Sequence, residues 1–578
     1  MIRPTMKTGK RDALHETSPL SGNQKGFRKL VKCLVIDGFC DEAKKLLALA
    51  IPVFLSQLMG FLLAFVSSAF CGHLGKIELD SVTLAVAIIN MTGLSVALGM
   101  TGACDTLVSQ TYGSKNLKRV GTILQRGILI SMLCCFPCWT IFINTEQILL
   151  LCKQRPDIAR LTQKYVMIFL PALPANFLMQ LQTKYLQNQN IMWPQVFIGI
   201  LVNVINAVAN AILIYVLKMG VEGSACVNTI SQWAMALFLF LYIIVKKLHT
   251  QTWGGWSRDC LQEWGPYMSL ALPSMLMICI EWSSLEIGGF LAGLISVAEL
   301  GCQAAMMELV IVSIMLSVGL SAAASVRVGN GLGAGKAEEA KKSSKVVLCI
   351  GALFGIIVGG TLAALKDVIG YIFTTDRDIL SLVSRIMLIF APFHLCDAIN
   401  TSSGGILRGF GKQKIGAITN VIGFLIIGLP LGISLMFLVK LGIIGLWIGL
   451  LCPMVLQSCI YLPYILRTDW NRACEEAKSR AGVGPKKVQK NSNSYTGFGS
   501  IENGELKDAD TENRGAIVLC NIASAEKESE DNLPLDASNV VGEILTVKQL
   551  IIRRGLAVFI CVAILLIGIV INVFASHR

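Results

Sequence analysis

Four carboxylic acids lie inside long apolar runs in the second half of this 578-residue chain. Each acid is given with the run that contains it: Glu281 and Glu286 in 267–294, Glu308 in 298–320 and Asp397 in 383–403. Placing one charge deep in a bilayer costs about 2.5–3.5 kcal/mol, so an ionisable side chain there marks a functional site by default. The sequence therefore predicts a site at which protons and cations compete for the same carboxyl groups.

The spacing of these acids decides which of them can share a cavity. Glu281 and Glu286 are separated by about 140° around a helix, so they straddle a groove rather than share a narrow face. Glu299 and Glu308 are close to 180° apart, so both cannot point into one cavity of a regular helix. Glu299 also begins its run and can reach water, and we therefore leave it out of the predicted site.

Basic residues are scarce in the same runs. Arg327, Arg385 and Arg408 all fall at the ends of runs. A buried carboxyl without a basic neighbour favours its protonated form, and an arriving cation favours the ionised form, so one group can exchange a proton for a cation. Pairing of the acids with Lys or Arg is the structural alternative.

Two neighbours of the acids have both a functional and a structural interpretation. His394 lies three residues before Asp397, on the same helix face, where it could tune proton exchange or simply form a hydrogen bond. Trp282 adjoins Glu281 and could offer its ring to an organic cation, although packing explains it equally well.

The first half offers polar groups without charge: Gln57, Asn90, Asn203 and Asn206. They could bind substrate, but amides in membrane helices more often join helices to each other. Asp105 lies near the end of a run, where a helix cap or a gate is expected.

Composition identifies the class of protein. Hydrophobic residues make up 54% of the chain, charged residues only 15%, and the mean hydropathy is +0.64. Soluble domains carry about 25% charged residues, so this is a polytopic membrane protein. The net charge of +13 is spread between the apolar runs, which argues against a nucleic-acid partner.

Thirteen apolar runs are long enough to cross a bilayer. They lie near 46–70, 82–103, 121–143, 164–183, 195–217, 223–245, 267–294, 298–320, 346–365, 383–403, 415–438, 442–466 and 555–575. Short loops after even-numbered runs hold 15 Lys and Arg, against 8 after odd-numbered ones. The positive-inside rule then predicts a cytoplasmic amino terminus and an extracellular carboxyl terminus.

The second half repeats the first at an offset of 220–221 residues. The matching pairs are Pro52 and Pro273, Gly113 and Gly333, and Pro171 and Pro392. An even number of spans per unit makes the repeats parallel. We predict an all-α polytopic protein built of two pseudo-symmetric six-helix bundles and a thirteenth carboxyl-terminal transmembrane helix.

The predicted domain boundaries follow from the runs and the polar segments between them. They are a cytosolic tail at 1–45, a first bundle at 46–245, an inter-lobe loop at 246–266, a second bundle at 267–466, a disordered cytosolic linker at 467–550 and the last helix with a short tail at 551–578. The linker is predicted from its Ser, Asn, Glu, Asp, Lys and Gly content.

Motifs for enzymes and ATP-driven pumps are missing or out of context. The run 329–335 satisfies G-x-G-x-x-A, but its flanks are membrane spans, so we predict a glycine-rich cytosolic turn. No P-loop and no H-E-x-x-H occur. The C-x-x-C spacing from Cys135 to Cys138 lies in a membrane run, which disfavours a redox or metal role. We expect no enzyme activity, cofactor or metal.

Several stretches resemble the multidrug and toxin extrusion family: Phe70–Lys76, Cys104–Gly113, Ala324–Asn330, Cys279–Trp282, Tyr371–Asp378 and Gly404–Gly409. The similarity covers nearly all of 45–470, and the thirteenth span is typical of the vertebrate branch, with its type 1 and type 2 proteins. The resemblance implies a monomeric, multi-pass transporter of the plasma membrane that exchanges organic cations for protons by alternating access.

The resemblance also implies roles for single residues. The family's acidic positions fall on Glu281, Glu286, Glu308 and Asp397, the last standing where well-known members carry Glu. Its polar positions fall on Gln57 and Asn90, and a functionally sensitive cysteine falls on Cys71. Leu285 and Met307 replace tyrosines near the site, so selectivity for substrates is expected to differ. A lipid-linked or anionic substrate, and a channel or receptor, are the alternatives.

Overall fold

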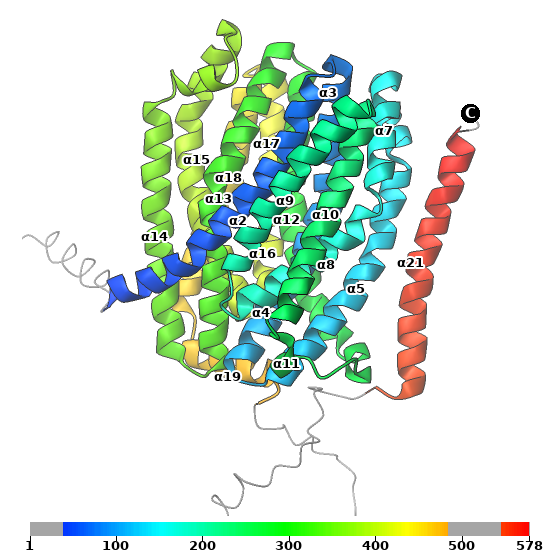
Figure 1. The fold of residues 1–578 in the computed structure, drawn as a ribbon. Coiled ribbons are helices and arrows are strands. Elements are labelled where there is room, and N and C mark those ends of the chain that lie inside the picture. The colour runs from blue at the N-terminus through cyan, green and yellow to red at the C-terminus, as the bar shows by residue number, and fades with distance from the viewer. Residues whose placement is uncertain (1–37, 484–544, 577–578) are drawn as a thin grey trace, which may run out of the picture.

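The first half of the chain forms a bundle of membrane-length helices, which we call the first lobe (Figure 1). The computed structural model describes residues 38–483 and 545–576. The first lobe consists of α2 (Phe39–Gly72), α3 (Lys76–Ile89), η1 (Asn90–Leu94), α4 (Ser95–Gly113), α5 (Leu117–Ile143), α6 (Thr145–Leu151), α7 (Pro156–Phe169), α8 (Ala172–Asn188), α9 (Trp193–Asn210), η2 (Ala211–Val216) and α10 (Gly220–Val245).

The second half forms a matching bundle, the second lobe, after a connection with α11 (His249–Thr252) and η3 (Arg258–Leu261). Its elements are α12 (Trp264–Gly293), α13 (Val297–Gly333), α14 (Ala337–Ala364), η4 (Ile369–Ile372), α15 (Arg377–Phe410), α16 (Gln413–Asn420), η5 (Val421–Gly428), α17 (Leu429–Ile433), η6 (Ser434–Leu438) and α18 (Ile443–Arg467). Two further helices follow, α19 (Trp470–Arg480) and α21 (Val547–Ser576).

The predicted spans are confirmed. Twelve described helices, some of them continuous through a π-helical segment, are long and apolar enough to cross a membrane, and a bent pair makes thirteen. The pair is α7 and α8, which meet at 54° around Leu170 and Pro171. The sequence analysis predicted one span near 164–183, and the structure adds the break. Proline has no N–H for the helix ladder, which explains why the bend falls here.

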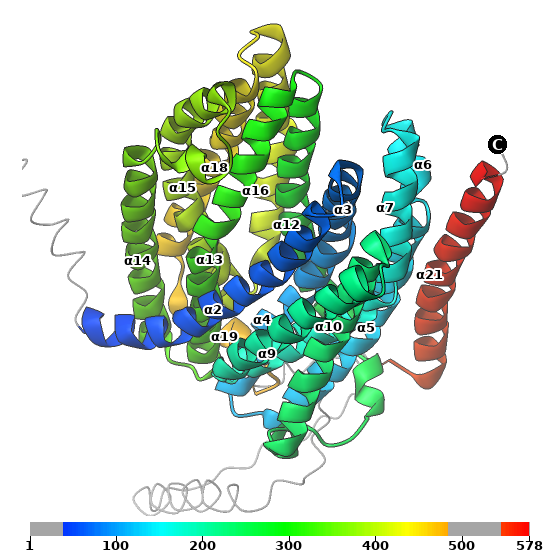
Figure 2. The same cartoon turned by 45° about the horizontal axis from the view of Figure 1, so that its top comes forward.

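The lobes pack most tightly at one end of the molecule, here called the α19 end (Figures 1 and 2). Helices α4 and α13 finish there, and glycines let their backbones meet. A Cβ at Gly113 would overlap the Asn330 carbonyl, and one at Gly333 would overlap the Gln110 carbonyl. The glycine run predicted as a turn is therefore helical up to Gly333, and only the residues after it turn, because the run is needed for close helix packing.

The carboxyl-terminal segments correct one boundary. Residues 470–480 form α19, with Trp470, Cys474 and Ala477 buried against the lobes. The linker predicted to be disordered from 467 is therefore wrong for this stretch, because an apolar face at helical spacing docks it. Most of the predicted linker, and the amino-terminal tail, lie outside the described residues.

The last helix lies against the outside of the first lobe beside α5, as Figure 1 shows in red. Asn572 donates to the Ile143 carbonyl, and Asn144 donates to the Gly568 carbonyl. Only 6% of the most apolar window of this helix is buried inside the protein. A helix so exposed and so apolar is suited to lipid contact.

Candidate functional site

The four predicted acids lie on three helices of the second lobe. Glu281 and Glu286 are on α12, Glu308 is on α13 and Asp397 is on α15. Asp397 is deeply buried, with 4% of its surface exposed. Glu281 and Glu286 are half-buried, and Glu308 is exposed at the protein surface. The acids therefore do not form one compact cluster.

Helix α15 is fixed at both ends by residues suited to the purpose. Asp376 caps its start by accepting a hydrogen bond from the Asp378 N–H at 2.9 Å. Gly411 ends it with a φ of 75°, the left-handed conformation that glycine adopts readily. Between these ends α15 packs against α13, α14 and α18, and this packing places Asp397 in the interior of the second lobe.

Glu281 and Asp397 are brought together. The two carboxyls lie within electrostatic range of each other, and Glu281 also lies within range of Arg408 and the Tyr461 hydroxyl. No hydrogen bond joins the two carboxyls among the described residues. That these two acids act together at one site stays a prediction.

Polar contacts hold α12 beside the pair. Asn420 donates to the Met277 carbonyl on α12 at 3.0 Å, one helical turn before Glu281. The Tyr461 hydroxyl on α18 donates to the Asn420 oxygen at 3.3 Å. Helices α12, α16 and α18 are thereby joined one turn before Glu281.

The carboxyl groups of the four acids have few or no hydrogen-bond or ion-pair partners among the described residues. Within residues 38–483 and 545–576, no hydrogen bond or ion pair reaches the carboxyls of Glu281, Glu286 or Glu308. The Asp397 carboxyl accepts a long hydrogen bond from Thr401 at 3.5 Å. Unsatisfied carboxyls at membrane depth are costly, and a ligand or a proton would remove that cost.

The predicted neighbours take different positions. His394 Nδ1 lies 3.9 Å from Asp397 Oδ2, too far for a hydrogen bond but on the same face. Its ring packs against Phe354 and Phe390, and its Nε2 has no partner among the described residues. Trp282 is half-buried beside Glu281.

Among the described residues, no hydrogen bond or ion pair joins the predicted first-lobe residues to the acids. Gln57 is exposed on α2, Asn90 begins η1, and Cys71 is fully buried. Asn203 donates to the Met59 and Gly199 carbonyls and Asn206 lies in a network inside the first lobe, so both amides join helices. For Asn203 and Asn206, the structure favours the interpretation as packing groups.

That network was missed from the sequence. Ser67 on α2 donates to Asn228 on α10 at 3.1 Å, and Asn210 on α9 donates to Ser67 at 3.2 Å. Asn206 donates to Ser231 at 3.0 Å, so three helices are joined in an interior without charge. The signal was present in three buried amides and two buried hydroxyls spread over three spans, but only the fold shows that they meet.

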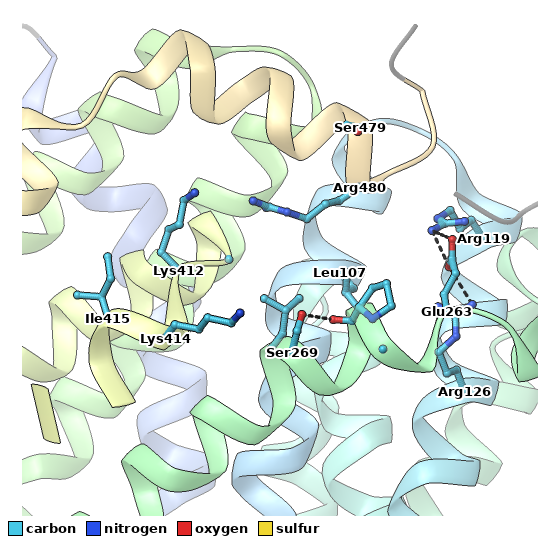
Figure 3. A pocket seen from close by; sticks show the side chains of 14 residues that line it. Leu107, Arg119, Arg126, Glu263, Ser269, Lys412, Lys414, Ile415, Ser479 and Arg480 are labelled. Carbon is cyan, nitrogen blue, oxygen red and sulfur yellow. Dashed lines mark hydrogen bonds and ion pairs between the residues drawn. The ribbon is translucent and has the colours of Figure 1, made fainter. Parts of the chain in front are cut away.

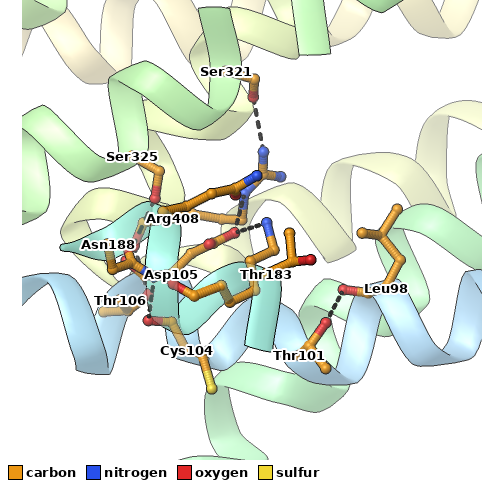
Figure 4. Close-up of polar contacts among 12 residues, drawn as sticks. Leu98, Thr101, Cys104, Asp105, Thr106, Thr183, Asn188, Ser321, Ser325 and Arg408 are labelled. Atoms are coloured by element: carbon orange, nitrogen blue, oxygen red, sulfur yellow. Dashed lines mark hydrogen bonds and ion pairs between the residues drawn. The ribbon is translucent and has the colours of Figure 1, made fainter. Parts of the chain in front are cut away.

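A second missed feature is an ion-pair group between the lobes (Figure 4). Asp105 on α4 pairs with Lys184 on α8 at 2.9 Å and with Arg408 on α15 at 3.5 Å. Arg408 also donates to the Ser321 hydroxyl at 2.7 Å. Asp105, predicted as a cap or gate, is thus the first-lobe half of a link between the lobes.

More links lie at the same end. Arg327 on α13 donates twice to the Glu42 carboxylate on α2, which also accepts from Ser343 at 2.5 Å. Gln110 donates to the Gly409 carbonyl at 2.8 Å, and Arg480 of α19 donates back to Gln110 at 3.1 Å. These contacts close the α19 end.

We also searched the described residues for metal ligands and paired cysteines. In the described part of the chain, no three His, Cys, Asp or Glu side chains come close enough to hold a metal ion. Cys134, Cys135 and Cys138 are free thiols inside α5.

The family model named MatE matches this chain twice, over residues 52–212 and 273–433. The two matches are offset by 221 residues, since 273 − 52 and 433 − 212 both equal 221. The repeat predicted from three pairs of residues is therefore confirmed.

Curated relatives match almost the whole chain. Multidrug and toxin extrusion protein 2 of Mus musculus is 54% identical over 538 residues, covering 92% of this chain and 92% of the relative. Multidrug and toxin extrusion protein 1 of Mus musculus is 51% identical, covering 95% and 96%. The protein 1 of Homo sapiens is 48% identical, covering 97% and 99%.

Solved structures share the fold. The crystal structure of a eukaryotic MATE transporter, AtDTX14, matches with a TM-score of 0.74 at 27% identity, covering 77% of this chain and 100% of that one. A structure described as the outward-facing conformation of a multidrug resistance MATE family transporter has a TM-score of 0.66 at 16% identity, covering 75% and 97%. The second likeness shows the fold alone.

Proposed function

Because this chain belongs to the multidrug and toxin extrusion family of membrane transporters, we propose that it exports organic cations in exchange for protons. The observation that supports this most directly is the pair of Glu281 and Asp397, two carboxyls within electrostatic range of each other inside an apolar lobe. Without a P-loop in the sequence, export against a concentration gradient would draw its energy from an ion gradient, and such a pair can hold either a proton or a cation.

Exchange follows from competition at Glu281. A protonated carboxyl is neutral and has no attraction for a cation, whereas an ionised one binds a cation and loses its proton. Asp397 helps because its negative charge attracts either ligand and makes double ionisation unfavourable. Glu286 and Glu308 extend the acidic surface along α12 and α13, and Gln57, Asn90 and Trp282 contribute contacts to the substrate.

Alternating access requires the two ends of the molecule to open in turn. The lobes are linked at the α19 end by Asp105, Lys184 and Arg408. Arg408 connects this link with the site, because it pairs with Asp105 and lies within electrostatic range of Glu281. When Glu281 is protonated and neutral, Arg408 pairs with Asp105 alone and the α19 end stays closed. When Glu281 ionises, it competes for Arg408 and weakens the closure.

We place the α19 end in the cytosol and the carboxyl terminus outside, in the plasma membrane, with one chain as the transport unit. The excess of Lys and Arg in the loops at this end supports the orientation. In this orientation the closed α19 end leaves the acids to exchange with the outer solution.

The test is uptake of a labelled organic cation into vesicles that contain the purified chain and have an acidic interior. We expect uptake that saturates and stops when the pH difference is collapsed. Uptake that is independent of the pH difference but depends on a Na⁺ gradient would contradict the proposed exchange with protons. Uptake of organic anions in place of cations would overturn the substrate class.

A further inference from the structure

A cavity of about 630 Å³ lies at the α19 end, away from the acids of the proposed transport site (Figure 3). It is lined by α5, the start of α12, the turn between α15 and α16, and the end of α19. Its volume is within the range of pockets that hold organic ligands, about 300–1,000 Å³. Nothing in the proposed exchange of protons and cations uses it.

The lining of this cavity is strongly basic. It has five cationic side chains, Arg119, Arg126, Lys412, Lys414 and Arg480, and one carboxylate, Glu263. In Figure 3, Lys414 and Arg480 extend toward the space between the elements, and Glu263 lies on the far side with the two α5 arginines.

Some of these cations pair with carboxylates and one does not. Glu263 lies 2.9 Å from both Arg119 and Arg126. Glu476 of α19, which is outside the lining, lies 2.7 Å from Lys412 and 3.1 Å from Arg480. Lys414 forms no ion pair within residues 38–483 and 545–576, so its charge is available to a ligand.

Two further observations point to an anionic ligand. The side chain of Arg126 is almost fully buried, with 2% exposed, yet its Nε has no hydrogen-bond partner among the described residues. The 30-residue helix α12 begins at the cavity, where Gly265 and Pro266 line it. Pro266 has no N–H, so at this helix start the Gly265 N–H and the partial positive charge of the helix are what favour an anion.

We propose that this cavity binds an organic ligand carrying two or more phosphate groups. Arginine forks match phosphate oxygens in pairs of hydrogen bonds, and a lining with five cationic side chains and one carboxylate suits a polyphosphate better than a single carboxylate. The phosphates can belong to the headgroup of a lipid or to a soluble molecule, since the chemistry of recognition is the same.

The position of the cavity gives the ligand a consequence for transport, and this part rests on the proposed alternating access. Arg119 and Arg126 belong to the first lobe, whereas Lys412 and Lys414 belong to the second. A polyphosphate bridging both sets holds the lobes together, so it stabilises the closed α19 end and slows transport.

Binding is tested on the full-length chain in detergent and in lipid nanodiscs. The soluble probe is inositol 1,4,5-trisphosphate, and the lipid probe is phosphatidylinositol 4,5-bisphosphate, compared with phosphatidylserine. We expect saturable binding and a raised melting temperature with at least one of the phosphorylated probes. Binding of the soluble probe identifies a site open to water, and binding of the lipid alone identifies a headgroup site.

Matched variants locate the ligand. Lys414 is exposed, so Lys414→Gln should fold normally and weaken binding by about tenfold through loss of one charge-assisted contact. Lys341→Gln removes an equivalent lysine, on α14 outside the cavity, and should bind as the unchanged chain does. Equal weakening in both variants, equal binding of phosphatidylserine, or no binding of either phosphorylated probe would overturn the proposal.

A further variant separates this proposal from the proposed function. Glu281→Gln should abolish transport and leave probe binding intact, because Glu281 does not line the cavity. In chains that transport, the bound probe should slow uptake, and Lys414→Gln should reduce that slowing. Binding without any slowing would overturn the regulatory part alone.

Discussion

Asn176 in the first lobe and Asp397 in the second lie 221 residues apart, the offset between the two halves that the family model matches. Both are buried, with 2% and 4% of their surfaces exposed. Asn176 donates to Gln232 at 3.1 Å, whereas Asp397 has only a long hydrogen bond and a second carboxyl nearby.

The interiors of the two lobes differ in the same way. In the first lobe, Ser67, Asn206, Asn210 and Asn228 bind one another and join helices without any charge. In the second lobe, Glu281 and Asp397 are left largely unpaired. Paired neutral groups stabilise a scaffold, and unpaired acids are available to ligands. The repeat thus supplies one backbone for two tasks.

The largest effect is expected for Glu281→Gln. Losing the group that exchanges the proton should lower transport by about a hundredfold or more, the scale on which proton-transfer groups act. Proton-driven uptake per molecule of inserted protein measures it. Glu222→Gln changes an exposed acid of the first lobe, paired with Lys164 at 3.3 Å, and should transport normally. Full activity of Glu281→Gln would contradict the assignment of ligand exchange to the unpaired acids of the second lobe.

The paired positions can be exchanged. Asp397→Asn should reduce transport by about tenfold and shift its pH dependence, because Glu281 loses a coupled carboxyl. Asp397→Glu should retain most activity. Adding Asn176→Asp to Asp397→Asn should not restore transport, since the new acid lies among the amides of the first lobe. Restoration would mean that the repeat position, and not its surroundings, makes the site.

Breaking the link between the lobes should have an intermediate effect. Asp105→Asn leaves Lys184 and Arg408 without their shared carboxylate, and loss of one partner of a buried ion pair costs about 3–5 kcal/mol, less where the partners are partly exposed. Faster hydrogen exchange in α4, α8 and α15 at the α19 end would report the opening. Asp157→Asn, at an exposed pair with Arg155, is the control and should exchange as before.

The neutral network should matter for stability alone. Ser67→Ala removes a hydroxyl that both donates and accepts in the first lobe, at a cost of about 1–3 kcal/mol. The melting temperature should fall while the pH profile of transport stays unchanged. Thr83→Ala, whose hydroxyl only donates to its own helix at 2.9 Å, should melt close to the unchanged chain. A changed pH profile in Ser67→Ala would assign the first lobe a part in proton exchange.

The smallest expected effect is on how stably α19 docks against the lobes at different pH values. Burial would raise the pKa of the Glu476 carboxyl, but the hydrogen bond from Lys412 and the charges of Lys412, Arg480 and Arg472 together hold that pKa below its ordinary value. A lowered pKa stabilises docking at pH values above the ordinary carboxyl pKa of about 4.3 and loses this contribution as the pH falls through the lowered value. Hydrogen exchange in α19 should therefore rise on acidification. Glu476→Gln should exchange faster at neutral pH and respond little to acid.

Much of the fold could be predicted because hydropathy alone gives it. Apolar runs of membrane length must form helices, since a bilayer offers no partner for backbone groups, and this reasoning predicted thirteen spans. The repeat was predicted separately, from three pairs of residues at one offset. The same reasoning did not find the bend at Pro171 or the helix of residues 470–480. A proline in a span can be absorbed or can break it, and a short amphipathic helix depends on the surface that receives it.

The sequence by itself determined that acids lie at membrane depth in the second half, because their cost is local to each helix. Only the tertiary structure decided that Glu281 and Asp397 lie within electrostatic range of each other while Glu308 is exposed, and that Asp105 pairs with Arg408 across the lobes. Contacts between residues hundreds of positions apart depend on how helices rotate and pack. That rotation is set by many small packing terms at once, and no single run of residues contains it.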